Sequence, residues 1–525
     1  MLVGALIGIA LWVTSTNFKQ DGPFIGVGRH SAVEIARQTL EKKGVVLNSE
    51  WKVYPSIRGN VDSQDRFVWQ TGGRKIYHQL MDPYLPPPGW NVRFARFSGD
   101  VAKRAEEYHV DIGASGEVIR FQHILPEKAP GDSLPEAQAR ALAHESLRAA
   151  LRLEPDGLKE ISAVPGKLPA RTDWTFTFSD PKKYPLKEGQ ARTVILLAGK
   201  ELADAYFYIF VPEEWERRET ARSYITSLIV ICCWAFLLLG FLVAGIMAIV
   251  HWSRRKFPVS TFLFFFAVSG LAHIVSFVNH WPVTLSNLST AEPVTHQLFK
   301  TITGGLVSIL LQSSFVALVM GYLQTKLSEK TVFEPDTVWI RGVSVALIFS
   351  GLLALLNHFG APSLAPRFAD YGHWGTYVPL LDSALGAVTE LINSIAMILL
   401  YFVFADRLSA SWSGKKLVVF FFFLILGLSL AGLQEIESIK YWAFSGLLSG
   451  LLMWGSYVLV FRFGLPSLVF SVGTVLVLGA IKQAVYRPFP HAVLAGVVQI
   501  ITVGVLSYCC VKKLEGPGSL RHVPD

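Results

Sequence analysis

Charged residues are scarce in this sequence, and their scarcity excludes an ordinary soluble protein. Of the 525 residues, 17% are charged and 51% are hydrophobic, and the mean hydropathy is +0.39. Soluble domains carry about 25% charged residues. The deficit is uneven, because residues 17–223 are rich in Glu, Asp, Lys, Arg and Pro, whereas 224–511 contain long stretches without charge. We therefore expect a soluble part joined to a membrane part.

Cysteine is equally scarce, and its placement excludes a disulfide framework. The four cysteines form two adjacent pairs, Cys232-Cys233 and Cys509-Cys510, both within apolar runs. Thiols at such depth usually act as small apolar side chains. Residues 17–223 contain no cysteine, so no disulfide can hold that part together.

The apolar runs predict about nine membrane-spanning helices after the N-terminal segment. A helix needs roughly 20 apolar residues to cross the hydrocarbon core. Runs of about that length occur at 224–250, 257–279, 301–323, 342–362, 377–400, 417–434, 441–461, 463–481 and 491–511. Residues 1–16 start with an apolar segment that lacks a basic beginning and a small-x-small cleavage site. We expect an uncleaved anchor there, with a signal segment as the alternative.

Basic residues predict how the chain is oriented in the membrane. They gather at alternate connections between the spans, and positively charged connections face the cytoplasm. Residues 17–223 are then extracytoplasmic, and the tail at 512–525 is cytoplasmic. This bias also explains the net charge of +8 without a nucleic-acid partner. The basic groups are Arg254 to Lys256, Lys326 with Lys330, Arg407 with Lys415 and Lys416, and Lys512 with Lys513 and Arg521.

Residues 17–210 predict an α+β domain made of two helix-plus-antiparallel-sheet units. Strand-like segments occur at 50–57, in a hairpin at 109–122, at 173–179, and in two runs joined at Gly199-Lys200. Ser31-Ala-Val-Glu34 and Ser133-Leu-Pro-Glu136 have the spacing of capping boxes, in which both side chains satisfy free amides at a helix start. They predict one helix that ends at Gly44 and another that reaches about Leu153.

Part of this domain resembles PepSY-type modules, which are small extracytoplasmic units that bind or restrain peptidases. The resemblance rests on DIGASGEVIRFQ (111–122) and DSLPEAQARALAHESL (132–147). It implies that a protein or peptide partner binds to this domain. The alternative is a structural domain without a ligand.

The segment VPEEWERRETARS (211–223) contains Glu213, Glu214 and Arg218 in the order Glu-Glu-x-x-x-Arg. That pattern is a catalytic signature in one family of membrane proteases. Here it precedes the first long span, so its carboxylates stand outside the bilayer. Acidic side chains after a proline suit the positive end of a helix. We therefore expect a charged juxtamembrane helix without catalysis.

Several stretches resemble the CPBP family, the CAAX-protease and bacteriocin-processing intramembrane metalloproteases. They are residues 189–223, FADRLSASWSGKKLVVFFFFLILG (404–427) and LVFRFGLPSLVFSVGTVLVL (459–478). The resemblance implies a bacterial inner-membrane protein and, if active, a bound zinc or other divalent metal. The family's motifs are missing from the spans: NSIAMILLYFVF (393–404), LILGLSLAGL (424–433) and FSVGTVLVLG (470–479) stand in the places of the glutamate pair, Phe-x-x-x-His and His-x-x-x-Asn. Such apolar helices supply neither a general base nor a metal ligand.

Four polar residues within the spans are candidates for a substitute site. Asp382, Glu390 and Asn393 have spacings that place them on about one face of a helix. A charge at bilayer depth costs about 3 kcal/mol, so Glu390 must face protein, a cavity or water. His273 in another span is a possible partner. The group could form a proton- or metal-linked site, or a hydrogen-bonded pair that only locks helix packing.

The sequence thus predicts a polytopic α-helical membrane domain of about nine spans with an N-terminal anchor and an α+β extracytoplasmic domain. The expected function is that of a CPBP-like pseudoenzyme, a scaffold or sensor in the lipid bilayer whose outer domain binds a partner. One alternative is an active CAAX-type peptidase with atypical residues around Glu390. Another is a proton-linked transporter that uses Asp382 and Glu390, although the paired broken helices typical of such proteins are not apparent.

Overall fold

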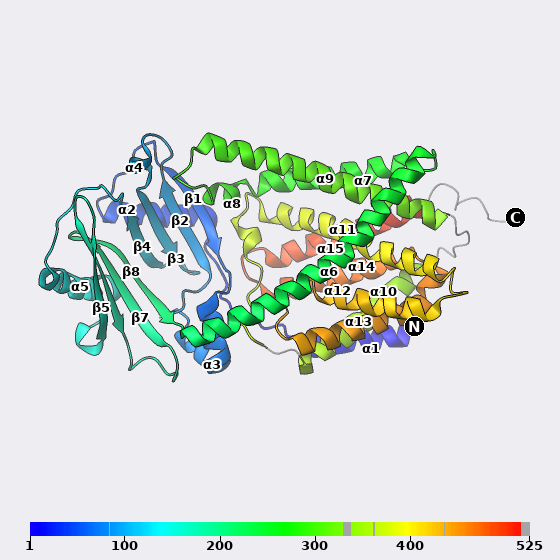
Figure 1. The fold of residues 1–525 in the computed structure, drawn as a ribbon, viewed down its shortest axis with the longest axis horizontal. Coiled ribbons are helices and arrows are strands. Elements are labelled where there is room, and N and C mark those ends of the chain that lie inside the picture. The colour runs from blue at the N-terminus through cyan, green and yellow to red at the C-terminus, as the bar shows by residue number, and fades with distance from the viewer. Residues whose placement is uncertain (83, 329–337, 361–362, 435, 516–525) are drawn as a thin grey trace.

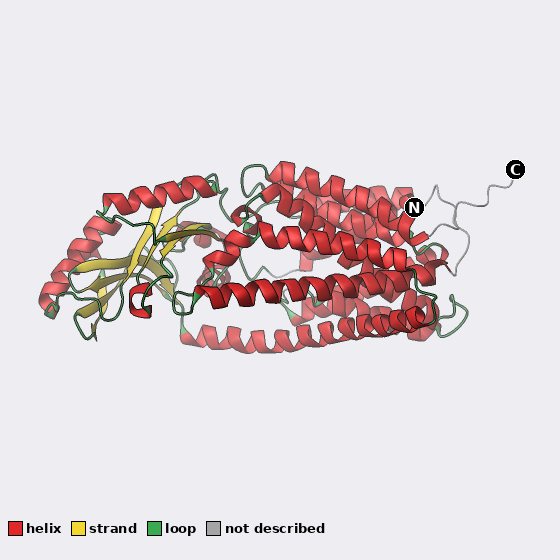
Figure 2. Ribbon diagram, turned by 90° about the horizontal axis from the view of Figure 1, so that it is seen from above, coloured by secondary structure: helices red, strands yellow, loops and turns green. Residues whose placement is uncertain are grey.

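The chain folds into a sheet domain and a helical bundle that lie end to end (Figure 1). The structure is a computed structural model that describes residues 1–525 apart from 83, 329–337, 361–362, 435 and 516–525. In Figure 2 the sheet and its covering helices form one end of an elongated molecule, and long helices form the rest. The expected combination of an α+β domain with a membrane-type helical domain is confirmed at this level.

A single antiparallel sheet of eight strands forms the first domain, in the order β1-β2-β3-β4-β8-β7-β6-β5. The expected strands at 50–57, 109–122 and 173–179 are present, as is the pair joined at Gly199-Lys200. The strands are β1 (Lys52–Arg58), β2 (Gly89–Ala95), β3 (Glu107–Ile112), β4 (Val118–Ile124), β5 (Lys159–Lys167), β6 (Thr172–Ser179), β7 (Gln190–Ala198) and β8 (Glu201–Phe210). The helices of this domain are α2 (Arg29–Lys42), α3 (Ser63–Leu80), α4 (Val101–Arg104), α5 (Glu136–Leu151) and the short η1 (Pro155–Gly157).

Two similar units build the sheet, since β1–β4 carry α2 and β5–β8 carry α5. The units meet where Gln122 of β4 pairs with Asp204 of β8. Strand alternation turns apolar residues such as Val92 and Val110 toward α2, and Phe176 toward α5. The opposite face of β1–β4 is therefore polar, and this face positions the residues discussed below.

Both predicted capping boxes are wrong. Helix α2 already begins at Arg29, with extended Gly28 as its N-cap, so Ser31 lies inside the helix. Helix α5 is capped by Pro135, which has no side-chain acceptor. The capping box is instead at the start of α3, where Asp62 accepts from the amides of Gln64 and Asp65. An Asp-x-x-Asp box was not anticipated because the expected pattern was Ser-x-x-Glu.

Eight of the described helices are long and apolar enough to cross a membrane. The expected run at 417–434 is present as α12, whose 16 residues are fewer than the roughly 20 of a full span. The bundle consists of α1 (Leu2–Ser15), α6 (Glu213–Ser253), α7 (Val259–Asn279), α8 (Trp281–Ser286), α9 (Val294–Ser328), α10 (Val338–Gly360), η3 (Gly372–Gly375), α11 (Pro379–Leu408), α12 (Lys416–Ala431), α13 (Ile439–Leu459), η4 (Phe461–Phe463), α14 (Ser467–Tyr486) and α15 (Ala492–Glu515). The first residues of the expected tail, 512–515, thus belong to α15, and 516–525 lie outside the described residues.

The N-terminal segment is packed into the bundle rather than detached from it. Gly4 and Gly8 of α1 form a Gly-x-x-x-Gly face, and a Cβ added to Gly8 would collide with the backbone at Leu347 and Ile348 of α10. A Cβ on Gly351 would likewise collide with the backbone of Gly8. Small residues allow such close approach of helices in membranes.

The charged segment 211–223 continues without interruption into the first span. Helix α6 runs for 41 residues with Pro212 as its N-cap. Glu213 lies 2.7 Å from Arg217 and Glu219 lies 2.6 Å from Arg222, so the charges are paired along the helix surface. Glu213 and Glu214 therefore stand before the apolar part of α6, in the arrangement expected of a charged collar.

Helix α11 lies at the centre of the bundle. It packs against α6, α7, α9, α12, α14 and α15, and its buried apolar residues between Ala387 and Ala405 belong to the main apolar core. Its N-terminal end faces the sheet domain (Figure 1).

Candidate functional site

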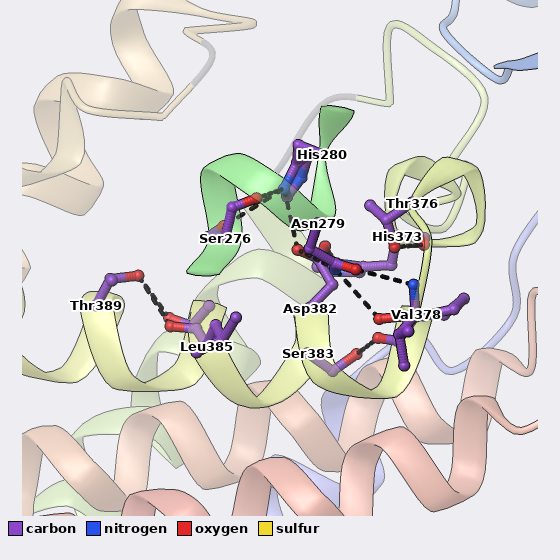
Figure 3. Close-up of polar contacts among 12 residues, drawn as sticks. Ser276, Asn279, His280, His373, Thr376, Val378, Asp382, Ser383, Leu385 and Thr389 are labelled. Carbon is purple, nitrogen blue, oxygen red and sulfur yellow. Dashed lines mark hydrogen bonds and ion pairs between the residues drawn. The ribbon is translucent and has the colours of Figure 1, made fainter. Parts of the chain in front are cut away.

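A buried carboxylate at the N-terminal end of α11 forms a polar site with several partners. Asp382 lies in the first turn of α11, and its side chain is 3% exposed. Its Oδ2 is 2.5 Å from Nδ1 of His373, and its Oδ1 is 3.2 Å from Nδ1 of His280 (Figure 3). Both carboxylate oxygens therefore face a histidine, and the positive end of the α11 dipole adds to the stabilisation of the charge.

Asn279 holds the end of α7 beside the start of α11. Its side-chain oxygen accepts a hydrogen bond of 2.8 Å from the amide of Val378, and its nitrogen donates to the carbonyl of Val378 at 3.2 Å. The carbonyl oxygen of Asn279 accepts from the amide of Tyr377. The asparagine nitrogen also lies 3.4 Å from Oδ1 of Asp382. Asn279 thus fixes the position of the neighbouring His280 relative to the carboxylate, as Figure 3 shows.

The proton of His280 can be assigned from its neighbours. Its Nδ1 lies 3.0 Å from the carbonyl oxygen of Ser276 and 3.2 Å from Asp382 Oδ1. Because both of these atoms are acceptors, Nδ1 carries the hydrogen. The hydroxyl of Ser276 approaches the same nitrogen at 3.4 Å. A catalytic triad needs the hydroxyl and the carboxylate on opposite ring nitrogens, so this trio does not have triad geometry.

His373 lies between two carboxylates. Its Nδ1 faces Asp382, and its Nε2 is 3.5 Å from Oδ2 of Asp370. The hydrogen bond to Asp382 raises the pKa of His373, burial opposes the shift, and the charges of Asp370 and Asp382 add to the rise. The imidazolium form is consequently favoured, and it balances the buried charge of Asp382.

The segment that carries His373 extends into the core of the sheet domain. Tyr371 and Trp374 pack into the apolar cluster under α2. The Tyr371 hydroxyl donates to the carbonyl of Pro23 at 2.7 Å, and the Trp374 indole donates to the carbonyl of Val27 at 3.0 Å. Gly59 lies against the Tyr371 ring, where an added Cβ would be 3.0 Å from the nearest ring carbon. His373, which contacts Asp382, therefore lies in a segment whose aromatic side chains pack in the core of the sheet domain.

The segment that follows His280 also docks on the sheet domain. Helix α8 packs on β1, and the loop after it is held by Arg93 and Glu107 on the polar face of the sheet. Arg93 donates to the carbonyl of Leu288 at 2.5 Å and pairs with Glu107, which accepts from the Thr290 hydroxyl at 2.7 Å. Burial raises the pKa of Glu107, but hydrogen bonds from His109, Arg93 and Thr290 outweigh it and hold the pKa at about 2. Glu107 is therefore ionised at neutral pH.

The remaining candidates from the sequence are not brought together. Glu390 is exposed on α11, two turns beyond Asp382, and Asn393 is exposed as well. In the part of the chain that the structure describes, no hydrogen bond or ion pair joins Glu390 to His273. The His273 ring instead lies 2.8 Å from the carbonyl of Ser269 on its own helix. No group of three or more His, Cys, Asp or Glu side chains that could hold a metal ion occurs among the described residues.

Sequence reasoning identified Asp382 but missed His280, His373 and Asn279. Asn279 is the last residue of the predicted span 257–279, His280 follows it, and His373 lies four residues before the predicted span 377–400. A weak local signal was that His280-Trp281 and His373-Trp374 both place a histidine before a tryptophan near a predicted span, but His251-Trp252 does the same. That pattern alone does not show that the two histidines meet at one carboxylate.

No family model, no curated protein and no solved structure matches this chain. The resemblances to CPBP proteins and to PepSY modules consequently stay hypotheses, and the site must be interpreted from its own geometry.

Loss of the positive charge of His373 should weaken its contact with Asp382 as the pH rises. The folded-state pKa of His373 lies above its ordinary value of 6.5, so its contribution is complete below pH 6.5 and is lost as the pH rises through the raised pKa. We expect His373→Gln to destabilise the protein by about 1.5 kcal/mol at pH 6, and by less at pH 9. Thermal unfolding of both proteins in detergent between pH 5.5 and 9 measures the difference.

The stability of the variant is compared with that of wild type at each pH because another histidine, His123, also changes its protonation in this range. Burial lowers the pKa of His123, but its contacts with Glu106 and Glu201 outweigh burial and raise the pKa to about 9. His123 titrates in the same way in both proteins, so its contribution cancels in the stability difference. A stability difference that stays constant or grows with pH would contradict the assignment of His373.

Proposed function

We propose that this chain is a non-catalytic membrane receptor or scaffold, in which the α+β domain binds a partner and the bundle responds. The observation that carries the proposal is the contact of Asp382 with His280 and His373, which we call the Asp382 junction. Two segments that dock on the sheet domain, α8 with its following loop and the segment 368–375, both reach this one carboxylate on the central helix. A partner that shifts the sheet domain would displace the histidines relative to α11.

The arrangement of polar groups supports a role without catalysis. Peptide hydrolysis in a membrane requires a polarised water, a general base and an electrophilic partner. Asp382 is occupied by two histidines, while Glu390 and His273 have no mutual contact among the described residues. These features agree with a CPBP-like pseudoenzyme, which we retain as the proposed ancestry.

The sheet domain is proposed to be extracytoplasmic, on the basis of the basic residues at alternate connections. A cysteine introduced at Asp132 in a chain whose native cysteines are replaced should react with an impermeant maleimide in intact cells. A cysteine at Ser413, beside Lys415 and Lys416, should react only after the cells are opened. The reverse pattern would show that the orientation is inverted.

The purified full-length chain should not cleave transmembrane or prenylated peptides in a metal-dependent manner. The measurement compares wild type, Glu390→Gln and His273→Ala in lipid nanodiscs, with added zinc and with a chelator. Glu213→Gln is the matched control, because Glu213 is paired with Arg217 outside the apolar part of α6. We expect all four proteins to give the same background signal.

Turnover that the chelator stops and that both Glu390→Gln and His273→Ala abolish would overturn the non-catalytic proposal. It would favour the alternative of an active intramembrane peptidase with atypical residues.

A further inference from the structure

The connection between α6 and α7 presents three consecutive basic side chains at the end of the bundle remote from the sheet domain. Helix α6 starts beside that domain and ends at Ser253 on the far side (Figure 1). Arg254, Arg255 and Lys256 follow it, and all three are exposed. None of them forms an ion pair with a residue that the structure describes. Their charges are therefore open to a ligand from outside the chain.

The backbone of this turn is fixed by hydrogen bonds at the end of α6. The amide of Lys256 donates to the carbonyl of His251 at 2.9 Å, and the amide of Arg255 donates to the carbonyl of Trp252 at 2.9 Å. These two bonds make a Schellman motif, in which the left-handed residue is usually glycine. Here Arg255 holds that position, with φ at +55°. The turn thus keeps a charge where the backbone favours glycine.

An aromatic cluster supports the turn from below. The ring of Trp252 stacks on that of Phe257 at 4.9 Å and meets Phe262 edge-on at 5.3 Å. The Phe257 ring is seated on α9, where a Cβ added to Gly321 would lie 2.4 Å from it. Trp252 remains 41% exposed. Tryptophan is enriched where the apolar core of a membrane meets the headgroups, so the turn lies at headgroup level.

A fourth basic side chain reaches the same corner from the end of α15. The hydroxyl of Thr261, in the first turn of α7, donates to the side chain of Gln324 on α9. The Gln324 nitrogen donates to the carbonyl of Lys513 at 2.9 Å. The Lys513 ammonium lies 5.7 Å from the centre of the Phe264 ring. The end of α15 is thereby held beside the start of α7.

The elements that form this corner contribute positive charge without nearby acidic residues of their own. Residues 245–262, 316–328 and 505–514 contain neither Asp nor Glu. Exposed apolar side chains, such as Ile249 on α6 and Leu263 on α7, continue along the helices next to the turn. The corner therefore combines a basic surface with an adjoining apolar one, which matches a ligand that is itself amphiphilic.

We infer that the turn between α6 and α7 binds the headgroup of an anionic phospholipid. Arg254, Arg255 and Lys256 would contact its phosphate, with Lys513 beside them, while the acyl chains lie along the exposed apolar side chains. Arginine can bind phosphate through two parallel hydrogen bonds. A zwitterionic lipid also carries a cation, which these basic groups repel. The inference depends on the bundle lying in a bilayer and is independent of the receptor proposal.

Native mass spectrometry of the full-length chain in a non-ionic detergent tests the site. Dioleoylphosphatidylglycerol and dioleoylphosphatidylcholine, which have the same acyl chains, are titrated separately at constant ionic strength. We expect the first phosphatidylglycerol to bind about tenfold more tightly than phosphatidylcholine, because each basic side chain near an anionic headgroup contributes roughly a fivefold factor.

Two double variants locate the binding at the turn. Arg254→Gln with Lys256→Gln removes two charges and leaves Arg255 in place. It should bind phosphatidylglycerol about tenfold more weakly. Its unchanged binding of phosphatidylcholine would separate loss of the site from loss of the fold. Lys415→Gln with Lys416→Gln is the matched control, because it removes the same charge from the connection between α11 and α12 at the same end of the bundle. The control should bind both lipids as wild type does.

The site is overturned if the two lipids bind equally, or if the variant at Arg254 and Lys256 keeps the preference for phosphatidylglycerol. It is also overturned if the control loses that preference to the same extent, since the preference would then belong to the whole charged end. Displacement of the lipid by glycerophosphate or polyglutamate at the same concentration would show a site for a soluble anion instead. The receptor proposal is judged separately by the proteolysis comparison, which involves none of these residues.

Discussion

The buried charge of Asp382 is the constraint on which the junction between the two domains depends. A carboxylate that is 3% exposed must be paired, because removal of one partner from a buried ion pair typically costs about 3–5 kcal/mol. Its partners come from two separate segments, one at the end of α7 and one in the segment before α11. Both segments continue into contacts with the sheet domain. The contacts of one carboxylate thus join the end of the central helix, two connecting segments and the sheet domain.

The sheet domain is connected to this junction through β1. Arg58 ends the strand that packs against α8 and η3, the elements that flank His280 and contain His373. Gly59, the next residue, lies against Tyr371. The end of β1 is therefore the edge of the sheet that touches both connecting segments. These contacts form a physical route from the sheet domain to the central helix.

Features that depend on local sequence patterns could be predicted, and features that depend on distant contacts could not. Apolar runs indicated the long helices, and alternation indicated β1, β3, β4 and β6 to β8, because each signal lies within about 20 residues. Glu390 attracted attention because a charge in an apolar run is also a local signal. Its pairing with His273 was expected only from residue types, and the described contacts do not include it.

The polar junction itself was beyond sequence reasoning. Asn279 and His280 precede Asp382 by about a hundred residues, and only the packing of α7 against α11 brings them together. The same holds for Arg58 and Asp111, which lie on strands separated by β2 in the sheet. The capping boxes failed for a different reason, since Gly28 and Pro135 end the extended chain at other points than the serines suggest.

Hydrogen exchange in residues 280–290 tests the central claim most directly, because this segment links Asp382 to the sheet domain. The opening free energy of the segment is compared in wild type, Asp382→Asn, Glu107→Gln and the double variant. If the junction acts as one unit, each single substitution lowers the protection of the whole segment, and the two effects combine non-additively by about 0.5 kcal/mol or more. Additive effects, with each substitution confined to its own end of the segment, would contradict the coupling of the two domains through Asp382.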